Sequence, residues 1–276
     1  MRPQHRLRHL LKAAGLSRSV FYYHRKGLME PDRDAEWGER LGELYQRHEG
    51  RYGYRRLHLA LRALGWRVNP KKVLRLMRAL GLKGIVAGRK RYVAYRGEGH
   101  RKVANVLRRD FRAGRPGEKL VTDITEMKVA GEKLYLSPLL DLHGNEVISF
   151  TLGTRPDLAL VTGMFTASVR ERLCKTEGGV LHTDQGWHYQ HAGYHRLLEQ
   201  MGLRPSMSRK GNCYDNAVVE SFFGTLKREL YRRREWPSVA ELAEAIKGYI
   251  RYYNEERIML RLKMSPVQYR RQFGSA

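Results

Sequence analysis

The spacing of apolar residues changes near residue 118, from helical repeats before it to short strand-like runs after it. Over residues 1–27, leucines recur at helical spacing, and a turn at the sequence LSRS precedes a second short helical pattern through Phe21 and Tyr22. Residues 34–48 repeat that spacing with Trp37 and Leu41. The first part of the chain is therefore predicted to be helical throughout.

Residues 55–82 read as two helices separated by a turn. The first has the stripe Leu57, Leu61 and Leu64 and is predicted to end at Gly65. Asn69 is a favourable N-cap and Pro70 suits the first position of a helix. In the second helix the inward positions are predicted to be Val73, Leu76, Met77 and Leu80, with Gly81 at its end.

The same spacing leaves four basic side chains on the outer face of this second helix: Lys71, Lys72, Arg75 and Arg78. A basic second helix after a turn is the arrangement by which a helix-turn-helix enters the major groove of DNA. A plain helical hairpin with a solvated basic face is the alternative reading. We predict DNA contact for these four residues.

Residues 84–117 are rich in Arg, Lys and Gly, with Tyr92 and Tyr95 among them. This composition predicts a basic linker or an extended arm able to follow a phosphate backbone; a merely solvated linker is the other interpretation.

From residue 118 the pattern predicts an α/β unit. KLVTDITEM, KLYLSPLLDLH and EVISFTLG read as three consecutive strands with turns near VAGE and HGN. Helices at about 157–173 and 190–201 alternate with strands at GGVLHT and LRPSMS, and another helix begins near Asp215. This order implies a mixed sheet flanked by helices. An amphipathic helix over 238–254 and a basic tail follow.

Charge narrows the class of partner. The 276 residues contain 53 Lys and Arg against 28 Asp and Glu, a formal net charge of +25. Such an excess predicts salt-sensitive attraction to polyanions, of which nucleic acid is the commonest. Hydrophobic residues make up 42%, enough for a packed core.

Targeting and redox signals are few. Cys174 and Cys213 offer neither a disulfide framework nor a CxxC ligand pair, as expected of reduced thiols. No apolar stretch of signal-peptide length follows Met1, and none approaches the roughly 18 residues of a membrane span. The expected location is the cytoplasm, with no membrane association.

Three carboxylates stand where sheet folds place reactive groups. Asp123 lies inside the first predicted strand, and Asp184 directly follows the strand ending in VLHT. Glu220 lies among valines and phenylalanines of the helix predicted to be capped by Asp215. Two carboxylates ~4 Å apart repel by roughly 4 kcal/mol at an effective dielectric of ~20. Convergence would therefore require a divalent cation or raised pKa values, and oxygen-only ligands favour Mg²⁺ or Mn²⁺ over zinc.

Helical spacing supports an inward position for Glu220, because Asn216, Glu220, Phe223 and Lys227 share one helical face. Apolar residues on the adjoining face are predicted to pack against the sheet. Glu220 would then project from the edge of the buried stripe, with Lys227 two turns further on.

The motifs around these acids resemble those of insertion-sequence transposases of the retroviral-integrase superfamily, in particular the OrfB type of the IS-three family. The motifs are TDIT around Asp123, HTDQGWHY around Asp184 and SMSRKGNCYDNAVVESFFGTLKREL around Glu220. The family's gap of 35 residues between the second Asp and the Glu is present, followed seven positions later by a basic residue, here Lys227. YGYRRLH and the C-terminal YIRYYNEERI extend the resemblance over nearly the whole chain.

The resemblance implies a ribonuclease-H-like catalytic core with a mixed five-stranded sheet and flanking helices, preceded by a small all-α helix-turn-helix domain. The expected boundaries are 1–83 for the DNA-binding region, 84–117 for the linker, 118–235 for the catalytic core and 236–276 for a C-terminal helical extension. HTD replaces the family's more frequent HSD, and Met259 stands where many members carry His. Neither departure touches the acids.

By the same resemblance, Asp123, Asp184 and Glu220 are expected to be the catalytic residues and the ligands of two Mg²⁺ or Mn²⁺ ions, with Asp123 bridging both. The expected activity is cleavage that frees a 3′-OH at the transposon end, followed by strand transfer into target DNA. The expected partners are double-stranded DNA, further copies of the chain on that DNA, and an upstream OrfA segment or frameshift fusion. The location implied is the bacterial cytosol, associated with the nucleoid.

Further DNA contacts are expected from Lys227, from Arg209 and Lys210 in the loop before the catalytic helix, and from Trp187, which could stack on an unpaired base. Tyr189 could stack in the same way, and core packing is at least as good an interpretation of this aromatic pair. Two alternatives to a transposase remain from the residues alone: a ribonuclease-H-like nuclease that cuts without joining, and a non-enzymatic DNA-binding regulator.

Overall fold

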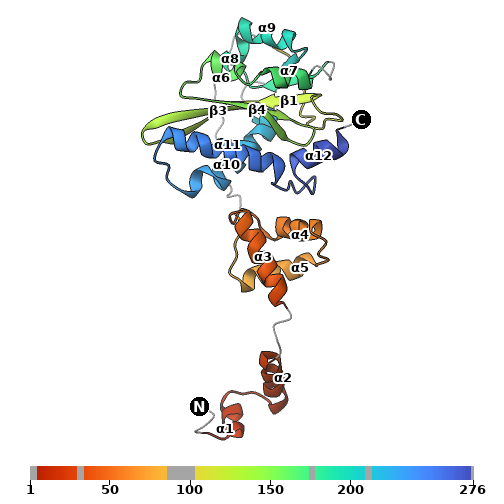
Figure 1. Cartoon of the computed structure of the whole chain (residues 1–276), viewed down its shortest axis with the longest axis vertical. Coiled ribbons are helices and arrows are strands. Elements are labelled where there is room, and N and C mark those ends of the chain that lie inside the picture. The colour runs from red at the N-terminus through yellow and green to blue at the C-terminus, as the bar shows by residue number, and fades with distance from the viewer. Residues whose placement is uncertain (1–4, 30–33, 86–102, 174–177, 209–212, 275–276) are drawn as a thin grey trace. The chain divides into compact units, whose positions relative to one another are not determined.

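The computed structural model describes residues 5–29, 34–85, 103–173, 178–208 and 213–274. The chain divides into two compact units, Met1–Gly84 and Ile85–Ala276; Figure 1 labels their helices and some of their strands. The first unit is helical in its described residues, and the second holds a sheet with helices on both faces.

The first unit contains five helices in its described residues: α1 (Leu7–Ala13), α2 (Arg18–Met29), α3 (Ala35–Arg47), α4 (Tyr54–Ala63) and α5 (Pro70–Ala79). The predicted start of α5 is confirmed, because the Asn69 side chain accepts a hydrogen bond from the Lys71 amide at 2.8 Å and Pro70 is the first helical residue. Helices α3 to α5 bury a shared apolar core that includes Leu41, Leu57 and Val73.

The prediction of a buried position is wrong for two leucines of these stripes. Leu64 and Leu80 are 45% and 48% exposed, although the stripes continue inward through Leu61 and Met77. Each is the residue after the last helical position, α4 ending at Ala63 and α5 at Ala79. Because each helix ends one residue before its leucine, the helical spacing that would direct these side chains into the core no longer applies to them.

The sheet of the second unit has six strands: β1 (Lys119–Thr122), β2 (Thr125–Val129), β3 (Glu132–Asp141), β4 (Glu146–Gly153), β5 (Val180–Thr183) and β6 (Arg204–Met207). β1 and β2 both pair antiparallel with β3, β4 pairs with β3 as well, and β5 and β6 extend the sheet in parallel from β1. Mixed pairing is confirmed, and the turns lie at the two places that the pattern predicts.

The segment predicted as the first strand forms two strands, β1 and β2. The sheet therefore has six strands instead of the expected five. The pairing Thr122↔Leu139 resumes at Thr125↔Leu136 without a change of register, which sets Asp123 and Ile124 opposite Pro138 and Ser137. Proline has no amide hydrogen and cannot donate to a ladder. The Ile124 amide instead donates to the Asp123 carboxylate at 2.8 Å. Asp123 therefore stands at a break between strands, and β1 and β2 together occupy one position in the sheet.

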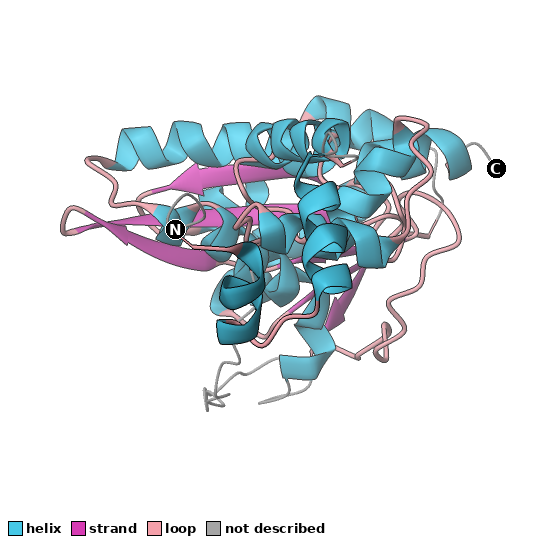
Figure 2. Cartoon of the chain, turned by 90° about the horizontal axis from the view of Figure 1, so that it is seen from below, coloured by secondary structure: helices cyan, strands magenta, loops and turns pink. Residues whose placement is uncertain are grey.

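Helices cover both faces of the sheet (Figures 1 and 2). On one face, Leu120, Leu139 and Leu181 pack against α6 (Leu158–Thr162), α7 (Ala167–Leu173), α8 (Trp187–Gln190) and α9 (Ala192–Gln200). On the other, Val121 and Leu140 pack against α10 (Ala217–Glu229) and α11 (Val239–Glu255). Neighbouring residues on one strand thus enter opposite cores, as the pleat requires.

One predicted helix is interrupted: the segment predicted over 157–173 divides into α6 and α7 around Gly163. The helix predicted over 190–201 is α9, and the short helix α8 before it was not predicted. His191 is extended and its ring nitrogen accepts from the Gly193 amide at 3.0 Å, so it caps α9 instead of continuing α8. The basic tail contains α12 (Pro266–Phe273), whose capping box of Ser265 and Gln268 is a signal visible in the sequence.

Residues 103–117 of the predicted linker belong to the second unit, while residues 86–102 lie outside the described residues. Leu107 is buried in the core, and the Ser206 hydroxyl of β6 accepts hydrogen bonds from the amides of Val106 and Leu107. Likewise α11, which begins the predicted C-terminal extension, buries Leu242, Ile246 and Ile250 against the sheet. Both segments contribute to the core of the second unit.

Candidate active site

Strand pairing places Asp123 beside Asp184. β1 and β5 are parallel with Leu120 opposite Leu181 and Val121 opposite His182, so the same offset sets Asp123 opposite Asp184. Adjacent strands are ~4.8 Å apart. Each acid is the first residue after its strand, Thr122 ending β1 and Thr183 ending β5. The sheet therefore presents a pair of half-buried carboxylates at one edge.

One oxygen of each carboxylate is held by a neighbouring backbone amide. Asp123 Oδ1 accepts from Ile124 N at 2.8 Å, and Asp184 Oδ1 accepts from Gly186 N at 2.9 Å. These short-range bonds fix the orientation of both side chains.

The pKa values of the two aspartates reflect two carboxylates that are partly buried and close to each other. Burial, and then the Asp184 carboxylate, raise the pKa of Asp123 well above its ordinary range; Glu220 adds a smaller contribution in the same direction. Burial also raises the pKa of Asp184. Lys227 acts in the opposite direction and lowers the pKa of Asp123. Two aspartates, one glutamate and one lysine therefore share an electrostatic site.

Glu220 and Lys227 reach this site from α10. Lys227 Nζ donates to the Glu126 carbonyl on β2 at 3.0 Å, three residues beyond Asp123. Tyr231, just after α10, exchanges hydrogen bonds with the backbone of Lys128. These contacts lay α10 along β2. Glu220, two turns before Lys227 and thus ~10.5 Å along the axis, is exposed at the outer end of the same helical face.

The side chains are not gathered into a closed ligand sphere. Among the described residues, no three His, Cys, Asp or Glu side chains lie close enough together to hold a metal ion as they stand. The influence of Glu220 on Asp123 is weaker than that of Asp184, in agreement with its exposed position.

Asp215 is not the N-cap of α10, contrary to the prediction. Asn216 is the N-cap residue of α10, and the fully buried Asp215 accepts hydrogen bonds from Asn105 Nδ2 and Arg109 Nε, both at 2.8 Å. Asp215 therefore anchors the 103–111 segment to the start of α10, five residues before Glu220. A role for Asn105 and Arg109 was not predicted, because nothing local in sequence links them to a residue more than 100 positions away.

Neither histidine near the acids is placed as a metal ligand. His182 is fully buried between the hydroxyls of Ser206 and Ser208, at 2.8 and 3.0 Å, and burial lowers its pKa to about 4. His188 contacts the Pro156 carbonyl through its Nε2. Both rings are therefore held by contacts with the surrounding chain.

The aromatic pair after Asp184 divides between surface and core. Tyr189 is 1% exposed and packs beneath the two aspartates, whereas Trp187 is 59% exposed and lies against the His188 ring, with 4.1 Å between the ring centroids. Core packing is thus the arrangement of Tyr189 alone, and Trp187 leaves an indole at the surface three residues from Asp184.

The remaining predicted DNA contacts are distributed unevenly. On α5, Lys71 and Arg78 are exposed, but Lys72 and Arg75 both bind the Asp34 carboxylate, and the Lys72 ammonium also stands 4.5 Å from the Trp37 ring centroid. Part of the basic face of α5 therefore braces α3. Arg209 and Lys210 lie outside the described residues.

Family models match most of the chain in three segments. An integrase core domain matches residues 113–213, a second integrase core model matches 220–273, and an HTH-like domain matches 32–91. The first two together span the sheet, α10 and α11, and the third spans α3 to α5.

Similar proteins agree with these models. A putative transposase InsK for insertion sequence element IS150 of Escherichia coli K12 is 50% identical over 264 residues, covering 95% of this chain and 93% of that protein. Transposase InsF for insertion sequence IS3A of the same organism is 35% identical, covering 75% and 71%.

A solved structure, a simian T-cell lymphotropic virus intasome in complex with the PP2A regulatory subunit B56 gamma, has a TM-score of 0.50 at 16% identity, covering 83% of this chain and 73% of that one. At this identity the likeness concerns the fold, and it supports a ribonuclease-H-like integrase core.

No helix among the described residues is both long enough and apolar enough to cross a bilayer.

Half of the residues are identical to those of a transposase over nearly the full length of both chains, and integrase-core models match the sheet. The protein therefore belongs to the insertion-sequence transposases of the IS-three family, which are polynucleotidyl transferases of the DDE class that act in DNA transposition.

Proposed function

We propose that Asp123, Asp184 and Glu220 are the catalytic carboxylates of this transposase, and that they serve both cleavage at the 3′ ends of the element and strand transfer into target DNA. The observation that carries the proposal is the parallel register of β1 and β5, which sets Asp123 and Asp184 side by side at the edge approached by α10.

The donor set suits a hard divalent cation. All three side chains offer oxygen ligands, as Mg²⁺ and Mn²⁺ prefer. Burial and then repulsion from Asp184 raise the pKa of Asp123, and a bound cation would lower that pKa by stabilising the ionised carboxylate. Asp123, Asp184 and Glu220 would hold the metal, two ions per site in our proposal. When bound, such ions activate the attacking oxygen and stabilise the leaving oxygen of a phosphodiester displacement.

The chain's own residues prepare the site for DNA. Backbone amides hold one oxygen of Asp123 and of Asp184, which leaves the second oxygen of each for the ligand. Because Glu220 is exposed on α10, we propose that it completes the ligand sphere when DNA and metal bind. Lys227 supplies positive charge beside β2 for a phosphate near the cleaved end, and the exposed Trp187 offers a surface for an unpaired base.

Strand transfer with a pre-cleaved end tests this proposal and separates a transposase from a nuclease. A duplex carrying the element's terminal repeat with a free 3′-OH is incubated with a supercoiled target plasmid in Mg²⁺, Mn²⁺, Ca²⁺ or EDTA. We expect joined products in Mg²⁺ or Mn²⁺ only, and none from the Asp123→Asn variant. Asp110→Asn is the matched control, because this acid is exposed and pairs with Lys119 away from the site.

Cleavage without any joining under these conditions would favour a nuclease. Binding that survives while neither cleavage nor joining ever appears would favour a regulator.

A further inference from the structure

The hairpin formed by α1 and α2, residues 7–29, has the connection of a helix-turn-helix. α1 ends at Ala13 and α2 begins at Arg18, leaving a turn of four residues, 14–17. Gly15 takes the left-handed conformation with φ +64°, and the Ser17 hydroxyl accepts from the Val20 amide at 3.2 Å at the start of α2. A turn of three or four residues that contains glycine is typical of DNA-binding helix-turn-helix units.

The hairpin that the HTH-like model covers is built differently. Six residues, 64–69, connect α4 to α5, and two of the four basic residues on α5 bind Asp34. The HTH-like match begins at residue 32, so α1 and α2 lie outside it. The segment with the shorter turn thus lies outside the HTH-like match, and the glycine does not distinguish the two hairpins, because Gly65 is also left-handed.

The surface of α2 is basic and aromatic. Tyr23 is 78% exposed and Tyr22 41%, and Arg18 is exposed as well. The guanidinium groups of Arg18 and Arg25 lie 5.9 and 6.0 Å from the Tyr22 ring centroid, one on each side of it along the helix. These three residues, four and three positions apart, form a row on one helical face.

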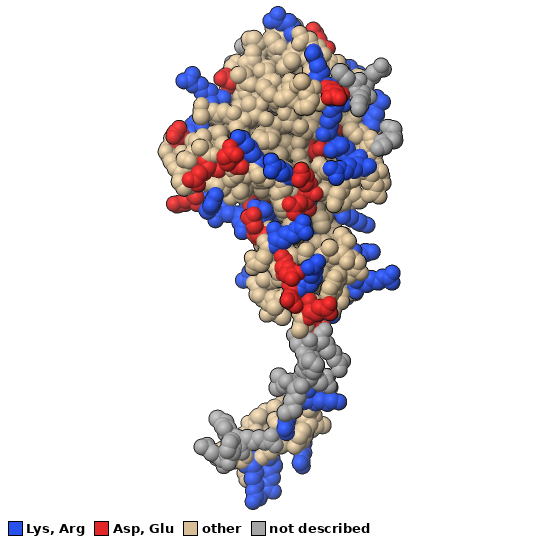
Figure 3. Space-filling view, in the orientation of Figure 1, with Lys and Arg blue, Asp and Glu red and all other residues tan. Residues whose placement is uncertain are grey.

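No acidic residue occurs in residues 1–29, which contain seven Arg and Lys. Figure 3 shows Lys and Arg without Asp or Glu over this part of the chain, whereas both signs mix over α3 to α5. A surface with one sign of charge attracts a polyanion at long range.

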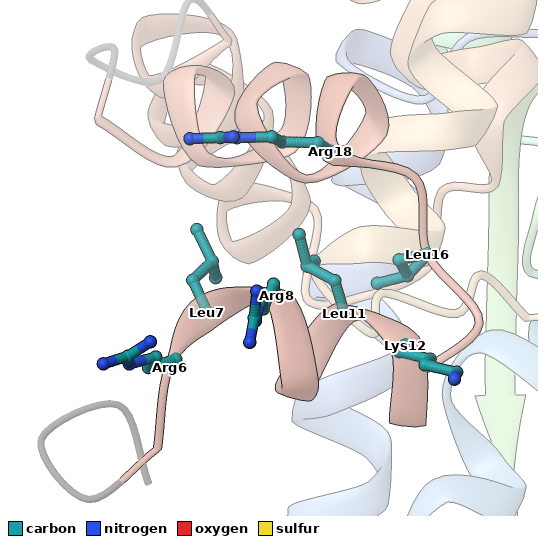
Figure 4. Close-up of a pocket in the computed structure, with 7 residues that line it drawn as sticks. All are labelled: Arg6, Leu7, Arg8, Leu11, Lys12, Leu16 and Arg18. Atoms are coloured by element: carbon teal, nitrogen blue, oxygen red, sulfur yellow. The ribbon is translucent and has the colours of Figure 1, made fainter.

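Basic side chains of both helices surround one opening. A cavity of about 550 Å³ lies between α1 and the start of α2, with Leu7, Leu11 and Leu16 among its lining residues. Arg6 is the residue just before α1, and Arg18 is the first residue of α2. Figure 4 shows that their side chains extend in the same direction beside these leucines. Groups from both helices can therefore reach one strand of a duplex, as in a helix-turn-helix whose first helix crosses the backbone.

We propose that residues 7–29 form a second DNA-reading unit, in which the N-terminal part of α2 enters the major groove and Arg18 and Arg25 contact base edges. This proposal rests on the proposed function, because the duplex it reads is the terminal repeat of the element. The chain then grips each end at two places, the α1–α2 hairpin and the α4–α5 hairpin.

The test is a binding titration of the full chain with two labelled duplexes, the terminal repeat and a shuffled version of it, over a range of salt. The informative variant is Arg18→Lys with Arg25→Lys, which keeps the charge but removes the planar guanidinium that bonds guanine in a bidentate manner. We expect the ratio of specific to non-specific affinity to fall on the order of tenfold or more, while binding to the shuffled duplex and its salt slope stay unchanged. Arg251→Lys with Arg261→Lys, on exposed positions of the other unit, is the matched control and should leave the ratio as it is.

An unchanged ratio in the Arg18→Lys, Arg25→Lys variant would overturn the inference, and so would an equal loss of affinity for both duplexes. Because the affinity ratio is a binding measurement, its outcome does not depend on whether the protein is catalytically active. If the ratio is unchanged while Asp123→Asn still abolishes joining, only the second reading unit fails. If Asp123→Asn keeps joining activity, the proposed function fails instead.

Discussion

The two ends of strand β1 lie beside acids in opposite surroundings. At the end where β3 turns into β4, Glu146 receives two hydrogen bonds from Arg172 and one from Arg270, and these outweigh its burial and lower its pKa. At the other end, Asp123 and Asp184 face each other across β1 and β5, and their pKa values are raised.

The same fold therefore stabilises one set of carboxylates with arginines and leaves the other set in repulsion. Asp141 belongs to the first end: burial raises its pKa, but it accepts hydrogen bonds from the amides of Gly117 and His143, and Arg172, 3.5 Å away, acts to lower the pKa. That arrangement is typical of a structural acid. Whether an acid has a positively charged partner is therefore a better indication of its function than its burial.

The largest expected effect is on chemistry at the repulsive end. Asp123→Asn removes one ligand charge while keeping the side-chain shape, so joining and cleavage should fall on the order of 10³-fold or more while the affinity for DNA stays within about twofold. Gel-based cleavage and fluorescence anisotropy measure the two. Cleavage near the wild-type rate would remove Asp123 from the active site.

The matching change at the neutralised end should act on stability instead. Glu146→Gln leaves Arg270 without its carboxylate and Arg172 with only the more distant Asp141, and we expect the free energy of unfolding to fall by about 2 to 4 kcal/mol, measured by urea denaturation. Because the folded-state pKa of Glu146 is lowered, its contribution is present above about pH 4.5, the ordinary value, and is lost as pH falls through the lower folded-state value. The variant should lack that pH dependence.

The exposed pair Glu244 and Lys247 on α11 is the control for this change, and its removal should cost less than about 1 kcal/mol. Equal losses from the two pairs would contradict the contrast between the two ends of β1.

An intermediate effect is expected at Asp215, which touches neither metal nor DNA in our proposal but anchors the start of α10. Asp215→Asn should weaken the hold of Arg109 and Asn105, misplace Glu220 and lower the cleavage rate about 10- to 100-fold. The specific readout is the Mg²⁺ concentration at half-maximal rate, which should rise, with partial rescue at high Mg²⁺. An unchanged Mg²⁺ dependence would show that Asp215 serves stability alone.

The smallest expected effect is on the stability of the metal-free protein. Asp184→Asn relieves the repulsion with Asp123, so the melting temperature in EDTA should stay unchanged or rise by the equivalent of about 1 kcal/mol. Added Mg²⁺ should stabilise the wild type and not the variant. A marked drop in melting temperature would instead identify Asp184 as a structural acid like Glu146.

Much of this molecule follows from local sequence. The cap of α5 at Asn69, the ends of β5 and β6, and the amphipathic α11 depend on residues that are neighbours along the chain, so their patterns predict them well. The motifs around Asp123, Asp184 and Glu220 identify the family for the same reason, since each motif is contiguous.

What tertiary structure alone decided involves residues far apart in sequence. The break after β1 needs Pro138 on the opposite strand, the anchoring of Asp215 needs Asn105 and Arg109, and the diversion of Lys72 and Arg75 to Asp34 needs α3 against α5. A local pattern records what each residue prefers, but it carries no record of which distant partner meets it. For that reason the chain's sequence identified the acids, whereas only the folded structure separates those that repel each other from those that arginines neutralise.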